Sequence, residues 1–426
     1  MMTGGAATEP ARNPLNAFQR LMRDWNEIHP YNAVTIVKIA GAPDVARLRA
    51  AARHAHEALD IDGFPLPYEV RQSDEPSGCD LAALGRHATR ELNRGFDDEA
   101  TFPARLWMLP RAGYHYIGQT FQHSVGDAYF LNSVLCRVLA GYLDVDVPAT
   151  LTVTDRDCPT IRRAFASSIG PHRWCTFGGR MIGELLRARR CHRPAYGDQS
   201  DLSARVRFPL LPDDLLERLR TAARGLGVTV NEIILAALAE AIALNTPERL
   251  TDLRRRELAL MAIVDLRPLR PELLMDKMGL YLSYFTVFCT GDDAQFSNLL
   301  PEIHRQSANA KATRSHLKAA MELQLAVTLW PRIPREQRIG YFSRCRPIVA
   351  GLSNMRLRDD WLAGGLDRRL LGCWWAASPG PMAPLAVLVT TSNGRLTCSL
   401  SSRASGFRPD VVDAIETQFV SRLAGL

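Results

Sequence analysis

The residues best suited to chemistry lie in one short segment, residues 121–128, which reads Phe-Gln-His-Ser-Val-Gly-Asp-Ala. His123 follows a run rich in aromatic residues that is typical of a strand, and Asp127 stands where a helical pattern begins. A turn between a strand and a helix holds a side chain rigidly while leaving it open to a cleft. A neutral imidazole there can remove a proton from a hydroxyl or an amine as that group attacks a carbonyl. The segment is therefore a candidate catalytic turn.

Two neighbours of His123 suit such a turn. Asp127 at the first turn of a helix is stabilised by the unpaired amides and the dipole there. Gly126 lets the backbone pass close to a substrate, or offers an amide to a developing oxyanion. The local sequence alone leaves a second interpretation open, in which His123 is a structural histidine and Asp127 only a helix cap.

The elements around this turn alternate between strands and helices. Before it we expect a helix, a strand, a second helix and two strands, at residues 13–27, 32–39, 43–59, 106–109 and 114–121. After it, apolar residues at one-face spacing predict an amphipathic helix over 128–143, and helical pattern returns over 161–166 and 178–190. Residues 187–203 then shift to charged and small residues with a proline and a glycine, which indicates a linker.

The second half of the chain repeats the mixture of strands and helices. Thr229 and Glu232 form a capping box ahead of the apolar run 233–244, which we expect to be a buried helix. The remaining predicted elements are helices at 212–225 and 410–423 and strands at 206–210, 258–264, 280–289, 347–352, 385–391 and 396–401. Strands mixed with helices in both halves predict an α/β fold of packed layers.

The order of these elements and several motifs resemble the CoA-dependent acyltransferase superfamily. That superfamily includes chloramphenicol acetyltransferase, non-ribosomal peptide condensation domains, polyketide-associated acyltransferases, wax ester synthases and the plant BAHD enzymes. Residues 123–127 resemble its H-x-x-x-D motif. Segments 227–239, 264–268, 352–354 and 393–400 are similar to its G-x-T-x-N-D helix, its L-R-P segment, its S/T-N pair and its last strand. The chain lacks a convincing D-F-G-W-G of the plant branch, so the bacterial branches fit better.

The resemblance, which spans roughly residues 14–424, implies a particular architecture. We expect two chloramphenicol-acetyltransferase-like lobes, each a mixed sheet flanked by helices, with an active-site tunnel between them. Residues 14–186 would form the N-terminal lobe that carries H-x-x-x-D, residues 187–203 the linker, and residues 204–426 the C-terminal lobe.

The resemblance also implies roles for particular residues. His123 would be the general base, and Asp127 would form a structural salt bridge with Arg267 rather than take part in proton transfer. The active-site loop and tunnel would include Gln122, Gly126, Ser353 and Asn354. No metal site is expected.

Three positions depart from the family pattern. Gln122 stands where condensation domains and wax ester synthases usually have a first histidine, Ala128 replaces a glycine, and Asp276 replaces an asparagine ahead of Gly279. Gln122 and Asp276 are the sequence support for an alternative, a catalytically degenerate family member that only binds a carrier protein or a small molecule.

The function that the resemblance implies is transfer of an acyl group from a thioester to a hydroxyl or an amine. The donor would be acyl-CoA or a phosphopantetheinyl carrier protein, used as a co-substrate, with no permanently bound cofactor. A free-standing condensation-type amide or ester synthase is the version that acts on carrier-bound substrates. Donor length, acceptor, and ester or amide product stay open, because they depend on the shape of the channel.

Composition narrows the remaining possibilities. The 426 residues carry a net charge of +7, but only four of the 52 basic residues are lysines and the arginines are dispersed among acids, so we expect no nucleic-acid partner. None of the nine cysteines forms a C-x-x-C pair, which argues against zinc-ribbon and thioredoxin sites. One uncharged stretch, residues 370–394, is long enough to span a membrane, but Pro379, Pro381 and Pro384 interrupt it, so it cannot be one apolar helix. No secretory signal is evident at the N-terminus. We expect a cytoplasmic monomer with no membrane span.

Overall fold

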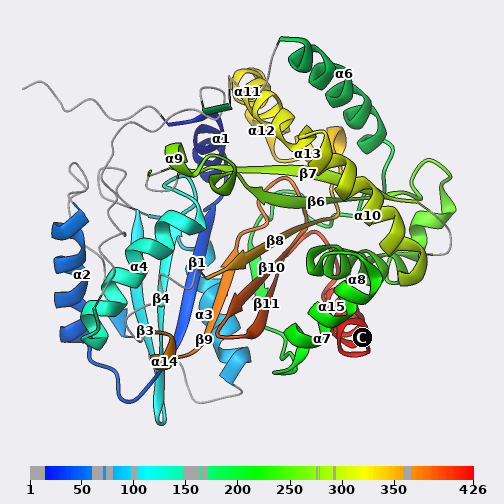
Figure 1. The fold of residues 1–426 in the computed structure, drawn as a ribbon. Helices are drawn as coiled ribbons and strands as arrows, with labels where there is room; N and C mark the ends of the chain where they lie inside the picture. The colour runs from blue at the N-terminus through cyan, green and yellow to red at the C-terminus, as the bar shows by residue number, and fades with distance from the viewer. Residues whose placement is uncertain are drawn as a thin grey trace, which may run out of the picture.

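Two β-sheets form the framework of the computed structural model (Figure 1). The structure describes residues 15–59, 71–72, 80–96, 103–146, 164–165, 171–274, 277, 279–290, 294–357 and 366–426. The first sheet has five strands in the order β2-β3-β4-β1-β9, and the second has six in the order β5-β11-β10-β8-β6-β7. Helices flank both sheets, so the expected α/β fold with two mixed sheets is confirmed.

The first sheet is built mainly from the N-terminal half of the chain. Its strands are β1 (Asn32–Ala40), β2 (Arg71–Gln72), β3 (Ala104–Arg111), β4 (Tyr114–Gln122) and β9 (Leu370–Ala377). Helices α2 (Val45–Leu59), α3 (Asp80–Asn93) and α4 (Ala128–Leu143) pack on it, whereas α1 (Ala17–Asn26) packs with apolar residues of the C-terminal half. Strand β1 is buried on both faces, since Val37 packs with α2 and α4 whereas Ile36 packs with α3. This position at the centre of the core makes β1 and β4 a rigid support for the turn that follows β4.

The second sheet packs with an almost wholly apolar helix, α8 (Val230–Leu244), as Figure 1 shows. Its strands are β5 (Ala204–Arg207), β6 (Leu258–Asp265), β7 (Leu282–Cys289), β8 (Ala350–Arg356), β10 (Leu385–Ser392) and β11 (Arg395–Arg403). Helices α7 (Leu215–Leu226), α8 (Val230–Leu244), α10 (Phe296–Ala312) and α15 (Pro409–Ala424) pack around one apolar core with this sheet. The predicted capping box is present, because Thr229 accepts from the amide of Glu232 and the Glu232 carboxylate accepts from the amide of Thr229.

Shorter elements complete the described chain. The helices are α6 (Pro171–Ala188), α9 (Pro271–Leu274), α11 (Ala319–Leu329), α12 (Arg335–Arg338), α13 (Tyr341–Cys345) and α14 (Leu366–Arg369). Four 3₁₀ segments cover Pro247–Thr251, Arg267–Leu269, Ser315–Lys318 and Trp330–Arg332. Residues 189–203, between α6 and β5, form no helix or strand. Within the described ranges no helix is by itself long and apolar enough to cross a membrane, although α7 and α8, bent by 98°, pass that test as a pair.

Strand β9 crosses from the C-terminal half into the first sheet. It pairs antiparallel with β1, with Cys373 opposite Val37. Strand β11 of the second sheet holds it there, because Thr397 Oγ1 donates to the Cys373 carbonyl at 2.5 Å and Ser399 Oγ donates to the Trp375 carbonyl at 2.6 Å. Strand β9 thus completes the first sheet, although it lies within residues 204–426, the segment expected to form the C-terminal lobe.

Several elements differ from the sequence predictions. Helices α3 and α10 and strand β9 were not expected, and the strand expected at 347–352 is β8, shifted toward the C-terminus. Of the helix expected at 161–166, only residues 164–165 are among those that the structure describes, and they are helical. Asp276 lies outside the described residues.

Candidate active site

The candidate turn lies between the end of β4 and the start of α4, as the sequence predicts. The strand ends at Gln122, whose carbonyl accepts from the amide of Val125 at 3.0 Å, and α4 begins at Ala128. The backbone amide of His123 donates to the Tyr31 carbonyl at 2.9 Å, which ties the turn to the start of β1. The side chain at 123 is therefore fixed by backbone contacts on both sides.

The ring of His123 lies between two aromatic side chains. The Tyr31 ring stacks on it at 5.7 Å between centroids and an angle of 14°, and the Phe121 ring meets its edge at 6.1 Å. The residue is 8% exposed, and its Nδ1 atom has no hydrogen-bond partner among the described residues. Burial lowers the pKa of His123 from the ordinary value of 6.5, although nearby backbone groups and the charge of Asp127 oppose that change. The neutral ring, which can accept a proton, is thus the favoured form.

The carboxylate of Asp127 is held by four donors. Oδ1 accepts from the Phe130 amide at 3.0 Å, which caps helix α4, and from Nη2 of Arg267 at 3.0 Å. Oδ2 accepts from Nε of Arg267 and from the Tyr281 amide, each at 3.0 Å. Asp127 and Arg267 are 1% and 0% exposed, so this is a buried bidentate ion pair of the strong, directional kind. The ion pair expected between these two residues is formed.

The rest of the Arg267 guanidinium is also occupied. Its Nη1 atom donates to the carbonyls of Leu274 and Lys277, and Nη2 donates to the carbonyl of Gly279 at 3.3 Å. The rings of Tyr129 and Tyr281 each lie 4.8 Å from the guanidinium carbon. Because a buried charge is stable only when it is paired and hydrogen-bonded, this complete set of partners explains how Arg267 is tolerated in the interior.

Gly126 is enclosed on three sides. A Cβ atom at this position would lie 2.8 Å from a ring carbon of Phe130, 2.9 Å from a methyl of Leu131 and 3.4 Å from the Gly279 carbonyl oxygen. The same Gly279 carbonyl accepts from the backbone amide of Asp127 at 3.0 Å. Glycine at 126 is therefore favoured by the close approach of the turn to the Phe130 and Leu131 side chains of α4.

Helix α1 adds two contacts that sequence reasoning missed. The side-chain amide of Gln19 donates to the backbone carbonyls of Ser124 and Val125 at 3.0 and 3.3 Å. The side-chain amide of Asn16 donates to the Leu280 carbonyl at 2.9 Å. Asn16 and Gln19 also form the capping box that starts α1. The capping box was readable in the sequence, but its side-chain bonds to distant carbonyls carry no local signal.

Comparisons with known proteins show which solved structures share the fold of this chain. No protein-family profile matches the sequence, and no curated protein matches it. Among solved structures, the first condensation domain of the calcium-dependent antibiotic synthetase, in complex with a substrate analogue, superposes with a TM-score of 0.66 at 16% identity, covering 98% of this chain and 96% of that one. The cyclization-docking bidomain of the non-ribosomal peptide synthetase EpoB from Sorangium cellulosum gives 0.64 at 16% identity, covering 97% and 87%. The condensation domain of the monacolin K polyketide synthase MokA gives 0.60 at 14% identity, covering 97% and 96%.

This chain has the condensation-domain fold. The superpositions extend over nearly its whole length, so the shared fold includes both halves of the chain. Identities of 14–17% establish the shared architecture alone.

Within the condensation-domain fold, the two residues expected near the tunnel lie on β8. Ser353 is partly exposed, and the exposed Asn354 donates from its amide to the Asn231 side chain at the start of α8, at 2.6 Å. The next residue, Met355, accepts through its sulfur from the Asn132 amide of α4 at 3.0 Å. This end of β8 therefore reaches helix α4, which begins at the candidate catalytic turn. The tunnel itself stays a prediction, as do the roles of Gln122, Ser353 and Asn354 in it.

Proposed function

We propose that this chain is a condensation-type acyltransferase that joins an acyl group, held as a carrier-protein thioester, to an amine or hydroxyl acceptor. The observation that carries the proposal is the buried imidazole of His123, with its Nδ1 atom unpartnered among the described residues, on a turn held by the buried Asp127–Arg267 pair. The condensation-domain fold supports it, because the same fold occurs in domains that are named for condensation and cyclization in peptide and antibiotic synthetases. A fold alone does not set a function, so the proposal depends on the geometry of the turn.

The proposed reaction needs one proton acceptor in the right place. The amine or hydroxyl attacks the thioester carbonyl and forms the new C–N or C–O bond, while its proton passes to the His123 ring. The C–S bond then breaks, and the imidazolium returns the proton to the departing thiolate, which leaves as a thiol. The donor and acceptor thus become an amide or ester and a free thiol, and His123 is regenerated.

Asp127 has a positioning role in this scheme. Both of its oxygens are occupied by the four donors described above, so neither is free to exchange a proton with His123. Its carboxylate fixes the start of α4 and, through the backbone, the loop that carries the imidazole.

The proposal is tested by mixing the chain with an acyl-loaded carrier protein or acyl-CoA and a panel of amines and alcohols, and detecting products by mass spectrometry. We expect product from the wild type with the carrier-bound donor and at least a hundredfold loss in His123→Ala, since a general base contributes roughly 10²–10⁴-fold. The exposed His54 on α2 supplies the control variant His54→Ala, which should keep the wild-type rate.

Three outcomes decide the details. Equal rates for His123→Ala and wild type would remove the general-base assignment. Faster turnover with acyl-CoA than with the loaded carrier would replace the proposed donor. No turnover with either donor, together with saturable binding of the carrier, would support the degenerate alternative that Gln122 raised.

A further inference from the structure

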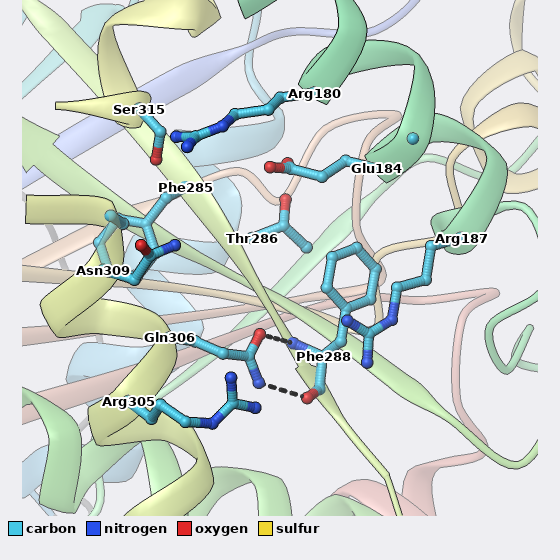
Figure 2. A pocket seen from close by; sticks show the side chains of 12 residues that line it. Arg180, Glu184, Arg187, Phe285, Thr286, Phe288, Arg305, Gln306, Asn309 and Ser315 are labelled. Carbon is cyan, nitrogen blue, oxygen red and sulfur yellow. Dashed lines mark hydrogen bonds between the residues drawn. The ribbon is translucent and has the colours of Figure 1, made fainter. Parts of the chain in front are cut away.

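A second candidate site lies on the outer edge of the second sheet, and none of its residues belongs to the catalytic turn. A cavity of about 430 Å³ opens between α6, β7 and α10 (Figure 2). Strand β7 is the last strand in the order β5-β11-β10-β8-β6-β7, so among the described residues no strand pairs with its outer edge. The cavity lies along this edge, because residues from both faces of β7, Phe285 on one and Thr286 and Phe288 on the other, line it. Its volume is within the range of roughly 300–1,000 Å³ of small-ligand sites.

One backbone position of this edge is already paired with an amide. The side chain of Gln306, on α10, accepts from the Phe288 amide at 3.0 Å and donates to the Phe288 carbonyl at 2.7 Å. This is the reciprocal pair of bonds that a residue of an adjacent strand would make, and Figure 2 shows both. The Gln306 amide therefore acts in the way that a peptide group of an added strand would.

The next outward-facing position, Thr286, has no such partner. In an antiparallel ladder, residues alternate between facing the paired strand and facing away, so Thr286 presents its amide and carbonyl on the same side as Phe288. No hydrogen bond joins the Thr286 backbone on that side to another described residue. Its side-chain hydroxyl is used, since it accepts from Nη2 of Arg346 at 3.0 Å. The cavity thus contains one unpaired backbone donor and one unpaired acceptor.

Two of the charged residues in the cavity wall are already neutralised. Glu184, on α6, accepts from the buried Lys318 ammonium. Arg187, one turn further along α6, makes a bidentate pair with Glu257 through Nε at 3.0 Å and Nη2 at 2.5 Å, and its guanidinium carbon lies 4.4 Å from the centre of the Phe288 ring. These pairs leave no net charge from their four members.

Two further arginines in the cavity wall are not neutralised by an ion pair among the described residues. Arg180 extends from α6 and Arg305 from α10, at opposite ends of the cavity in Figure 2. Neither forms a hydrogen bond or an ion pair with any other residue in the described part of the chain. The unpaired Thr286 backbone lies on the strand between them, so the cavity combines two free guanidinium groups with one free peptide edge.

We propose that this cavity binds a short acidic peptide segment in extended conformation, as one residue of added strand along β7. The bound residue exchanges two backbone hydrogen bonds with Thr286, as the Gln306 amide does with Phe288. Carboxylates on either side of it meet Arg180 and Arg305 in charge-assisted hydrogen bonds, and its apolar side chain lies on the same face as Thr286, beside the ring of Phe288. Addition of a strand to an exposed sheet edge is a general mode of peptide recognition, with the backbone giving affinity and the flanking side chains giving specificity.

The test uses a fluorescein-labelled, end-blocked tripeptide Glu-Val-Glu and measures fluorescence anisotropy with the full chain. We expect saturable binding that weakens about tenfold or more in Arg180→Glu and in Arg305→Glu, because each loses a charged hydrogen-bond partner. The matched control is Arg220→Glu, which makes the same change of charge on the exposed part of α7 and should bind as the wild type does. Equal binding by Arg180→Glu, Arg305→Glu and the control would overturn the assignment.

Two further measurements separate a peptide site from a simple anion site. The same tripeptide with an N-methylated valine cannot donate to the Thr286 carbonyl, and we expect its binding to fall at least tenfold. Hydrogen exchange of residues 282–289 should slow when Glu-Val-Glu is present. If the N-methylated tripeptide binds equally, or if inorganic phosphate binds with the same dependence on Arg180 while the tripeptide leaves exchange unchanged, the strand-pairing proposal fails.

Discussion

The imidazole of His123 sits where its neutral form is favoured at neutral pH. Burial between the rings of Tyr31 and Phe121 penalises the imidazolium and lowers the pKa of His123 below 6.5. Protonation removes the base, so the rate falls as pH falls through that lowered pKa. We expect the acid limb of kcat/KM to have its midpoint below pH 6.5 and a slope of one proton, measured with an acyl-loaded carrier. A midpoint above 6.5, or the same limb in His123→Ala, would mean that another group is titrating.

The tight packing around Gly126 predicts that adding one methyl group there lowers both stability and activity. In Gly126→Ala the new methyl would approach Phe130 and Leu131 to less than 3.0 Å, and both side chains belong to the core beneath α4. Overpacking of this kind costs roughly 1–3 kcal/mol, and a shifted turn also moves the imidazole. We expect a lower melting temperature together with a lower kcat. Gly225→Ala, on α7 with open space around it, is the control and should be neutral or slightly stabilising.

At the scale of elements, the Asp127–Arg267 pair joins the start of α4 to the 3₁₀ segment after β6. Asp127→Asn leaves the Arg267 charge buried without its carboxylate, and breaking a buried pair in this way costs about 3–5 kcal/mol. The free energy of unfolding in urea measures the loss. The exposed pair of Arg207 and Asp413 offers the comparison, because Asp413→Asn should cost less than about 1 kcal/mol. Equal stability of the two variants would show that the buried pair is not a structural link.

Glu322 of α11 forms a buried network with Lys318 and Arg346, and this network predicts how the free energy of unfolding depends on pH. Burial alone would raise the pKa of Glu322, but Arg346 and Lys318 outweigh it and bring that pKa to about 2. The folded-state pKa is thus below the ordinary 4.5, so this contribution is present above pH 4.5 and is lost as the pH falls toward 2. It amounts to on the order of 3 kcal/mol.

Glu322→Gln tests this network directly. The variant leaves Arg346 and Lys318 facing a neutral amide, so we expect it to be less stable than the wild type at pH 7 and to lose less further stability between pH 4.5 and 2. Urea unfolding across that range gives both quantities. Parallel pH curves for the two proteins would contradict the assignment of this acid sensitivity to Glu322.

Local patterns predicted the elements whose signals are contained in their own residues. The capping box of Thr229 and Glu232, the apolar run of α8 and the turn at residues 123–127 are of this kind. Helix α10 was missed because Pro301 lies inside it, and β9 because nothing in its sequence identifies β1 as its partner. The bonds from Gln19 to the catalytic turn end on backbone carbonyls, which every residue has. The pairing of Asp127 with Arg267 could be anticipated only from the family resemblance, since 140 residues separate them.

At the scale of the whole molecule, three of the connections that join the two sheets involve the crossing strand or the catalytic turn. Strand β9 pairs with β1, while side chains of β11 donate to its carbonyls. Arg267 forms an ion pair with Asp127 at the start of α4. Helix α1 donates hydrogen bonds from Asn16 and Gln19 to backbone carbonyls of both halves. Each is buried, so separating the halves would leave unpaired backbone and charged groups. The two halves should therefore unfold together.

This coupling is tested by weakening one core and observing the other. Leu238 of α8 is fully buried in the second core, and Leu238→Ala should cost about 2–5 kcal/mol. If the halves unfold as one unit, hydrogen exchange in β4 of the first sheet should accelerate by the factor that this cost implies, and calorimetry should give a single transition at a lower temperature. Unchanged protection of β4 beside a destabilised second sheet would show two independent units, and the crossing of β9 would then be a contact without cooperative consequence.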